Sequence, residues 1–192
     1  QLDILLHKKI PMGAGLGGGS SDAAFMMRIL NEEYQLGMNN SEMKKRVSKL
    51  GADCAFFIDP HPAYATGIGD IFFPITLSLK KWVLVLVKPQ TSVSTQEAYS
   101  QIVPQKTSVD LREALALPVE EWKNVVCNDF EKSVFSTHPE IEAIKETLYD
   151  MGACFALMSG SGSTVFALFK KKQDDLRKIF SDCFTFQSTL LQ

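Results

Sequence analysis

Residues 11–24, PMGAGLGGGSSDAA, constrain this chain more than any other stretch. Five glycines stand within positions 13–19, and residues 20–36 have the apolar spacing of an amphipathic helix. A glycine inside a helix costs about 1 kcal/mol relative to alanine, so the glycines at the start of this helix must meet another need. The N-terminus of a helix offers unsatisfied N–H groups, and residues without Cβ let a phosphate approach them closely. The stretch therefore predicts a phosphate-binding loop, with a flexible loop that merely ends a strand as the alternative.

Two common phosphate-binding motifs fit this stretch poorly. A Walker A motif requires a lysine directly after its second glycine, and here Gly19 stands at that position. Gly13, Gly15 and Gly18 satisfy the pattern G-x-G-x-x-G, but a dinucleotide site also expects a strand ending in an acidic residue about 20 residues on. That region has helical character in this sequence. A dinucleotide-binding oxidoreductase is therefore kept only as a distant alternative.

The composition argues against several classes of function. The 192 residues carry a net charge of −2, which gives no electrostatic basis for binding nucleic acid or an acidic membrane surface. The longest strongly apolar run, 82–87, is far too short to cross a bilayer. The histidines are scattered and the cysteines form no C-x-x-C pair, so neither a zinc site nor a disulfide framework is indicated. We expect a cytoplasmic protein with reduced thiols, a monomer or weak homodimer that binds neither nucleic acid nor membranes.

The hydrophobic pattern predicts a mixed α+β chain of two domains, 1–78 and 79–192, with the break near residue 79. In the first domain we expect a strand at 2–10, a helix at 20–36, and a second helix at 39–51 that Ser41 caps and Gly51 ends; a hairpin follows at 62–75. The second domain is expected to hold strands at 80–89, 153–158, 164–170 and 184–191, helices at 94–100, 138–152 and 173–183, and an irregular segment with short helical pieces at 105–137.

Two glycine-rich segments resemble motifs of the GHMP kinases, the small-molecule kinases named for galactose, homoserine, mevalonate and phosphomevalonate. PMGAGLGGGSSDAA is similar to the second motif of this family, and SGSGSTVFAL, 159–168, is similar to the third. With LGADCAFFI, 50–58, and AYATGIGD, 63–70, they most resemble the members that act in the non-mevalonate route to isoprenoids. The resemblance runs from about residue 8 to about residue 170.

This resemblance implies a fold and a reaction. The fold would be the two-domain GHMP kinase fold, with a truncated N-terminal part like domain 2 of ribosomal protein S5 and a ferredoxin-like C-terminal domain. The protein would use ATP and Mg²⁺ to phosphorylate the 2-hydroxyl of a small molecule that carries a cytidine diphosphate. Ser20 or Ser21 would offer oxygens to the metal. The residues expected to bind ATP are Pro11, Met12, Gly13, Ala14, Gly15, Leu16, Gly17, Gly18, Gly19, Ser20 and Ser21.

Asp53 is the expected catalytic base, because the family's catalytic aspartate stands in the same motif. Without the resemblance, a simple turn aspartate would be the better interpretation. Its place beside Gly51 and before an apolar run would leave the carboxylate partly desolvated and able to orient an alcohol. Asp22 complements a helix dipole and Asp70 closes a turn, so neither is assigned to catalysis.

The substrate side is expected to involve residues from four segments. An aromatic side chain at Tyr99 would stack on cytosine, although a core aromatic on a short helix is an equal alternative. The full set expected to contact substrate is Asp53, Ile68, Thr95, Tyr99, Gly160, Ser161 and Gly162. For residues 159–162 the simpler interpretation is a tight turn between two strands.

The chain also departs from the family pattern. The first motif, which supplies a lysine and an asparagine, is expected upstream of residue 1, because the sequence opens on an apolar segment without a start signal. We therefore expect the natural protein to be longer by several strands. Cys54-Ala55 replaces the more usual Val-Pro after the catalytic aspartate. Another GHMP kinase acting on homoserine, mevalonate or a sugar alcohol, or a non-catalytic nucleotide-binding relative, are the alternatives.

Overall fold

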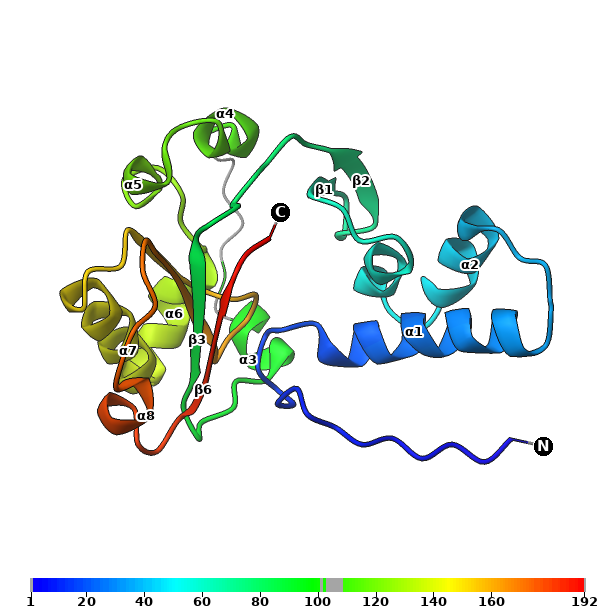
Figure 1. The fold of residues 1–192 in the computed structure, drawn as a ribbon, viewed down its shortest axis with the longest axis horizontal. Coiled ribbons are helices and arrows are strands. Elements are labelled where there is room, and N and C mark those ends of the chain that lie inside the picture. Colours follow the sequence, from blue (N-terminus) through cyan, green and yellow to red (C-terminus); the bar gives the residue numbers. More distant parts are fainter. Residues whose placement is uncertain (1, 101, 103–108, 192) are drawn as a thin grey trace. The chain divides into compact units, whose positions relative to one another are not determined.

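A computed structural model describes residues 2–100, 102 and 109–191, and two compact units form (Figure 1). One unit combines Gln1–Leu16 with Ser78–Gln192, and the other is Gly17–Leu77. Helices and two antiparallel sheets are present, which confirms the α+β fold class. The domain division at residue 78 stays a prediction, since the structure groups the first 16 residues with the C-terminal part.

The Gly17–Leu77 unit is mainly helical. It contains α1 (Gly18–Glu33), α2 (Asn40–Val47), a 3-10 helix η1 (Ala52–Ile58) and the predicted hairpin of β1 (Ala63–Thr66) and β2 (Ile71–Pro74). Its small core unites buried side chains of the three helices: Ala24, Met43, Val47, Cys54, Ala55 and Ile58. Helix η1 packs against both α1 and α2, so the core fixes the segment that carries Asp53.

The predicted cap of α2 and its predicted C-terminal end are both wrong. Asn39, not Ser41, is the cap: its side chain accepts a hydrogen bond from Glu42 N at 3.0 Å, and Glu42 Oε2 accepts one from Asn39 N at 2.9 Å. This reciprocal capping box satisfies two helix donors, whereas Ser41 lies inside the helix. The helix ends at Val47, and Gly51 instead precedes η1.

The other unit is built on a four-stranded antiparallel sheet of order β4-β5-β3-β6. Its strands are β3 (Val83–Lys88), β4 (Phe155–Met158), β5 (Val165–Phe169) and β6 (Phe184–Thr189). Val83, Val85 and Val87 alternate along β3 and are almost completely buried. They lie opposite Phe169, Ala167 and Val165 of β5, so one face of the sheet is continuously apolar.

Helices cover that apolar face. They include α6 (Phe130–Thr137) and α7 (Pro139–Asp150), and α7 packs directly on β4 and β5. The remaining helices of this unit are short: α3 (Thr95–Ser100), α4 (Leu111–Leu115), α5 (Val119–Trp122) and α8 (Leu176–Ile179). The prediction of short helical pieces at 105–137 is confirmed from residue 109 on, and residues 105–108 lie outside the described residues. No helix in the described ranges is long and apolar enough to cross a membrane.

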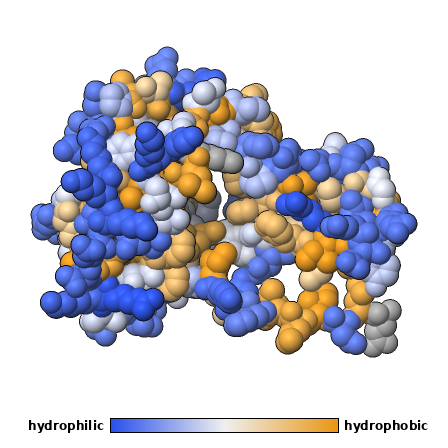
Figure 2. Space-filling model, in the orientation of Figure 1, coloured by the Kyte–Doolittle hydropathy of each residue, from blue (hydrophilic) through white to orange (hydrophobic). Residues whose placement is uncertain are grey.

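The predicted strand at 2–10 is wrong. This segment is extended but belongs to no sheet, and Leu5 is 99% exposed and Ile4 61% exposed. Figure 2 shows hydrophobic residues gathered on the surface at the lower right, where Figure 1 places this segment. A strand needs a neighbour for its backbone hydrogen bonds, and no strand among the described residues pairs with this one.

Helix α7 anchors the sheet through Ile141, which is fully buried. We expect Ile141→Ala to lower the free energy of unfolding by about 2–5 kcal/mol, because the sheet cannot collapse into the cavity left behind. Ile179→Ala, at a side chain that is 47% exposed, should change it by less than about 1 kcal/mol. Urea unfolding of both variants tests this, and equal losses would contradict the packing described.

Candidate active site

The two glycine-rich segments contact each other directly. The carbonyl of Ala14 accepts a hydrogen bond from Thr164 N at 3.2 Å, and the carbonyl of Gly15 accepts one from Ser159 Oγ at 2.8 Å. Gly15 has a φ of +69°, and a Cβ built there would lie 1.9 Å from the carbonyl oxygen of Ser159. Only glycine permits so close an approach of two backbones. Residues 11–16 and the turn after β4 therefore form one surface, although Gly15 and Ser159 are 144 positions apart in sequence.

The turn from Ser159 to Gly162 connects β4 to β5, as the hairpin interpretation predicted. Ser159 N donates to the carbonyl of Thr164 at 2.8 Å, and Gly162 N donates to the carbonyl of Ser159 at 2.9 Å. Gly160 and Gly162 both have positive φ values, +54° and +90°. The turn thus places backbone groups, together with the Ser159 hydroxyl, beside residues 11–16.

A third segment, the loop after β3, completes this surface, and no motif in the sequence indicates it. A Cβ built at Gly13 would lie 3.3 Å from Cβ of Ser92. At the start of this loop, the buried Lys88 donates from Nζ to the carbonyls of Pro89 at 2.9 Å and Thr91 at 3.2 Å. The contact between Gly13 and Ser92 joins positions far apart in the chain, so a local pattern could not predict it.

The expected phosphate-binding segment runs along the chain into Gly17 and the N-terminus of α1, which belong to the other unit. Gly17 precedes the helix with a φ of +64° and makes no side-chain cap, so the first N–H groups of α1 depend on another acceptor. Ser20 and Ser21 stand in the first turn and are half-buried. Hydroxyl oxygens of this kind suit Mg²⁺, which prefers oxygen ligands. Among the described residues, no three His, Cys, Asp or Glu side chains gather into a metal site.

Asp53 stands in the first turn of η1, in the same unit as α1. Its Oδ1 lies 3.4 Å from a Cβ built at Gly69, so the carboxylate faces the glycine turn of the β1–β2 hairpin. The expected partial desolvation is wrong: Asp53 is exposed, because Cys54, Ala55 and Ile58 take the buried face of η1.

The hairpin turn beside Asp53 carries Ile68, another expected substrate residue. The Ile68 side chain is 80% exposed. Asp70 Oδ1 accepts a hydrogen bond from Ile68 N at 3.3 Å, which confirms that Asp70 stabilises the turn.

Helix α3 presents Tyr99 and Thr95 to solvent, while Ala98 faces the core. Tyr99 is 63% exposed, so the alternative of a core aromatic is wrong. Its ring meets Phe130 edge-on, with centroids 4.9 Å apart. This contact holds the tyrosine while leaving much of its surface open for stacking.

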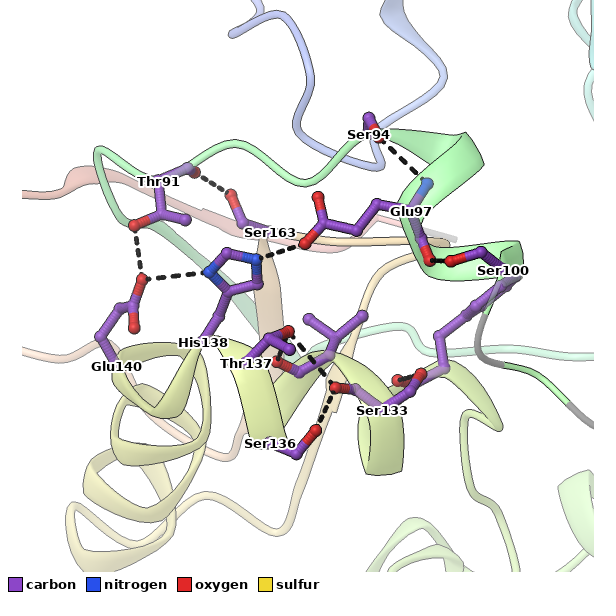
Figure 3. A network of polar contacts seen from close by, with 12 residues as sticks. Thr91, Ser94, Glu97, Ser100, Ser133, Ser136, Thr137, His138, Glu140 and Ser163 are labelled. Carbon is purple, nitrogen blue, oxygen red and sulfur yellow. Dashed lines mark hydrogen bonds and ion pairs between the residues drawn. The ribbon is translucent and has the colours of Figure 1, made fainter.

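A polar network connects α3 with the glycine turn (Figure 3). His138 Nε2 lies 3.0 Å from Glu97 Oε1 of α3, and His138 Nδ1 lies 3.8 Å from Glu140 Oε1. Thr91 Oγ1 donates to Glu140, and this hydrogen bond lowers the pKa of the Glu140 carboxyl. Ser163 Oγ in turn donates to the carbonyl of Thr91. The network thereby connects α3, which carries Tyr99, to the segment 159–168, which contains the glycine turn between β4 and β5.

Comparison with known proteins assigns the chain to a family. Family models described as "GHMP kinases N terminal domain" and "GHMP kinases C terminal" match residues 1–61 and 110–183. The chain is 52% identical over 189 residues to 4-diphosphocytidyl-2-C-methyl-D-erythritol kinase of Bacteroides fragilis, covering 98% of this chain and 69% of that protein. The chain belongs to the GHMP kinase family. The kinase of the same name from Parabacteroides distasonis is 52% identical over 190 residues, covering 98% of this chain and 70% of that protein.

Solved structures confirm the GHMP kinase fold. The crystal structure of a 4-(cytidine 5'-diphospho)-2C-methyl-D-erythritol kinase, 30% identical, aligns over 94% of this chain and 68% of that chain with a TM-score of 0.75. A homoserine kinase from Cytophaga hutchinsonii aligns over 94% of this chain and 67% of that chain with a TM-score of 0.73, but at 17% identity it supports the fold alone. The resemblance to GHMP kinases drawn from the motifs is thus confirmed, while the roles of individual residues stay predictions.

Proposed function

We propose that this GHMP kinase transfers the γ-phosphoryl group of ATP to the 2-hydroxyl of 4-diphosphocytidyl-2-C-methyl-D-erythritol. The observation that carries the proposal is the 52% identity, over nearly the whole chain, to kinases named for that substrate. The mutual contact of the two glycine-rich segments supports it, because phosphoryl transfer depends mainly on positioning and on charge stabilisation.

In the proposed reaction, Pro11 lines the loop, and backbone N–H groups of residues 12–19 and of the first turn of α1 bind the phosphates of ATP. Mg²⁺ neutralises phosphate charge when bound, and Ser20 or Ser21 would be its protein ligand. The substrate hydroxyl oxygen forms a bond to the γ-phosphorus, the bond from that phosphorus to the bridging oxygen of ADP breaks, and Asp53 accepts the hydroxyl proton. Gly160, Ser161 and Gly162 place their backbone near the reacting groups.

The cytidine end of the substrate is assigned to α3 and the hairpin turn. Tyr99 stacks on cytosine, Ile68 flanks the base and Thr95 contacts the diphosphate. The protein is expected to act in the cytoplasm as a monomer or weak homodimer, with residues 1–78 and 79–192 as its ATP-binding and C-terminal domains.

Stacking by Tyr99 makes a specific kinetic prediction. We expect Tyr99→Ala to raise the KM for the cytidine substrate about 10- to 100-fold, because stacking of one base on an aromatic ring contributes about 1–3 kcal/mol. Tyr99→Phe keeps the ring and should retain a KM within about threefold of the original. The KM for ATP serves as an internal control. Equal KM values for the alanine variant and the parent protein would show that Tyr99 does not contact the cytidine substrate.

A coupled assay of ADP release tests the proposed function. The purified protein receives Mg-ATP and either 4-diphosphocytidyl-2-C-methyl-D-erythritol, homoserine or mevalonate. We expect kcat/KM for the cytidine substrate to exceed the others by at least about 1,000-fold, since a site built to bind cytidine leaves polar groups unpaired with the smaller alcohols. Faster turnover of homoserine or mevalonate would show that the protein is a GHMP kinase with a different substrate. Loss of all kinase activity would favour the non-catalytic alternative.

A further inference from the structure

Asn128 stands two residues before α6 and holds the glycine turn with its side chain. Its Nδ2 donates to the carbonyl of Met158 at 2.9 Å and to the carbonyl of Gly160 at 2.8 Å. Its Oδ1 accepts a hydrogen bond from Phe130 N at 3.0 Å. An amide side chain has two N–H donors at one end and an acceptor at the other, so these three bonds fix one orientation of Asn128.

Glu131, in the first turn of α6, binds the backbone N–H of Met158, the residue whose carbonyl Asn128 binds. Its Oε1 accepts a hydrogen bond from Met158 N at 2.9 Å, and its Oε2 accepts one from Lys145 Nζ at 2.7 Å. Glu131 is only 9% exposed, so its charge is balanced inside the protein by Lys145. Both polar groups of Met158 are therefore tied to residues 128–131.

The peptide between Gly160 and Ser161 needs such a constraint. Glycine tolerates both signs of φ, so the backbone alone does not determine which way a peptide plane in a glycine-rich turn faces. In a trans peptide the N–H points opposite to the C=O. Because Asn128 holds the Gly160 carbonyl and the Gly160–Ser161 peptide is trans, it also directs the N–H of Ser161 away from Asn128.

A shift of this turn would also displace the phosphate loop. A Cβ built at Gly160 would lie 3.3 Å from the carbonyl oxygen of Gly15, and Ser159 Oγ donates to that same carbonyl. The segment that starts at Asn128 also carries Phe130, whose ring supports Tyr99. One short segment thus positions elements at both ends of the expected substrate.

We propose that Asn128 is a positioning residue for phosphoryl transfer: it orients the Gly160–Ser161 peptide so that the Ser161 N–H can bind the transferring phosphoryl group. This inference rests on the proposed function and assigns Asn128 no contact with substrate. Removing a donor that acts on the transferring group should lower kcat more than it raises KM.

The test compares Asn128→Asp with a matched control in the same unit. Asn128→Asp keeps the shape of the side chain but places an oxygen against two carbonyl oxygens. Gln187 is the control, because its Nε2 donates to the carbonyl of Gln173 at 2.9 Å and its Oε1 accepts from Gln173 N at 3.1 Å, in a clasp between β6 and the loop before α8. We expect Asn128→Asp to lower kcat about 10- to 100-fold with both KM values within about threefold, and Gln187→Glu to leave kcat within about twofold. Equal kcat values for Asn128→Asp and the parent protein, or equal losses in both variants, would overturn the proposal.

A binding experiment separates this inference from the proposed function. In ¹⁵N-labelled parent protein, the non-hydrolysable analogue AMP-PNP with Mg²⁺ is expected to shift the amide resonance of Ser161, and in Asn128→Asp that shift should be lost. This readout needs no turnover, so it decides the role of Asn128 even for a protein inactive on the cytidine substrate. Asn128→Ala removes the repulsion between oxygens and serves in place of Asn128→Asp if the latter does not fold. A Ser161 amide that does not respond to the nucleotide in the parent protein contradicts the proposal.

Discussion

Replacing Asp53 by asparagine is expected to lower kcat by about 100- to 10,000-fold, because an amide cannot accept the hydroxyl proton that a carboxylate takes. The carboxylate is exposed and faces the glycine turn of the hairpin rather than the core, so the substitution should leave the free energy of unfolding nearly unchanged. The KM for ATP should stay within about threefold, since the groups proposed to bind the phosphates are backbone N–H groups of other residues. Steady-state kinetics with ATP and the cytidine substrate measures both values.

Asp59→Asn is the matched control for this substitution. Asp59 follows η1 directly, and its partners are His61 at 3.0 Å and Lys44 at 3.9 Å, all with substantial exposure. Exposed ion pairs contribute about 0–1 kcal/mol, so the control should lose little stability and no activity. If both variants keep the parent kcat, Asp53 is not the base. If both lose it, the effect belongs to the local fold and not to proton transfer.

Among glycine-to-alanine substitutions in residues 11–19, we expect Gly15→Ala to cause the largest loss of stability and activity. The new Cβ would lie 1.9 Å from the carbonyl oxygen of Ser159, and the backbone would hold alanine at a φ of +69°. The unfavourable φ costs about 1–2 kcal/mol, and forcing the two backbones apart costs about 1–3 kcal/mol more. Since the two glycine segments must separate, we expect kinase activity to fall below about 1% of the parent value.

Gly37→Ala separates these two costs, because it carries only the first. Gly37 has nearly the same backbone conformation, with a φ of +66°, but no atom lies within 4 Å of a Cβ built there. The free energy of unfolding of Gly37→Ala should therefore fall by only about 1–2 kcal/mol, and this variant should keep its kinase activity. Urea unfolding of both variants gives the difference. Equal destabilisation would show that the contact between Gly15 and Ser159 does not constrain the protein.

Local patterns in the sequence predict most elements of this fold. The alternating valines of β3 and the apolar spacing of α7, with Pro139 in its first turn, reflect forces that act between neighbouring residues. The two glycine motifs indicate the family through their resemblance to known GHMP kinase motifs. The strand expected at 2–10 is wrong because strand formation depends on a partner as well as on apolar residues.

Contacts between distant residues account for what the sequence could not predict. Ser92 packs against Gly13, and Asn128 binds the carbonyls of Met158 and Gly160. Neither residue belongs to a motif, and each reaches its position only through the order of strands in the sheet. The exposure of Asp53 is likewise beyond a local pattern, since it follows from which face of a short 3-10 helix meets the core.

Phosphorus NMR of the reaction products identifies the hydroxyl group that this protein phosphorylates. The purified protein is incubated with Mg-ATP and 4-diphosphocytidyl-2-C-methyl-D-erythritol, and Asp53→Asn is run in parallel. We expect a new phosphomonoester resonance that grows in step with ADP and is coupled to the carbon at the 2-position of the methylerythritol, while the cytidine diphosphate resonances are retained. ADP accompanied only by inorganic phosphate, or a phosphomonoester at another hydroxyl, would contradict the proposed phosphorylation of the 2-hydroxyl.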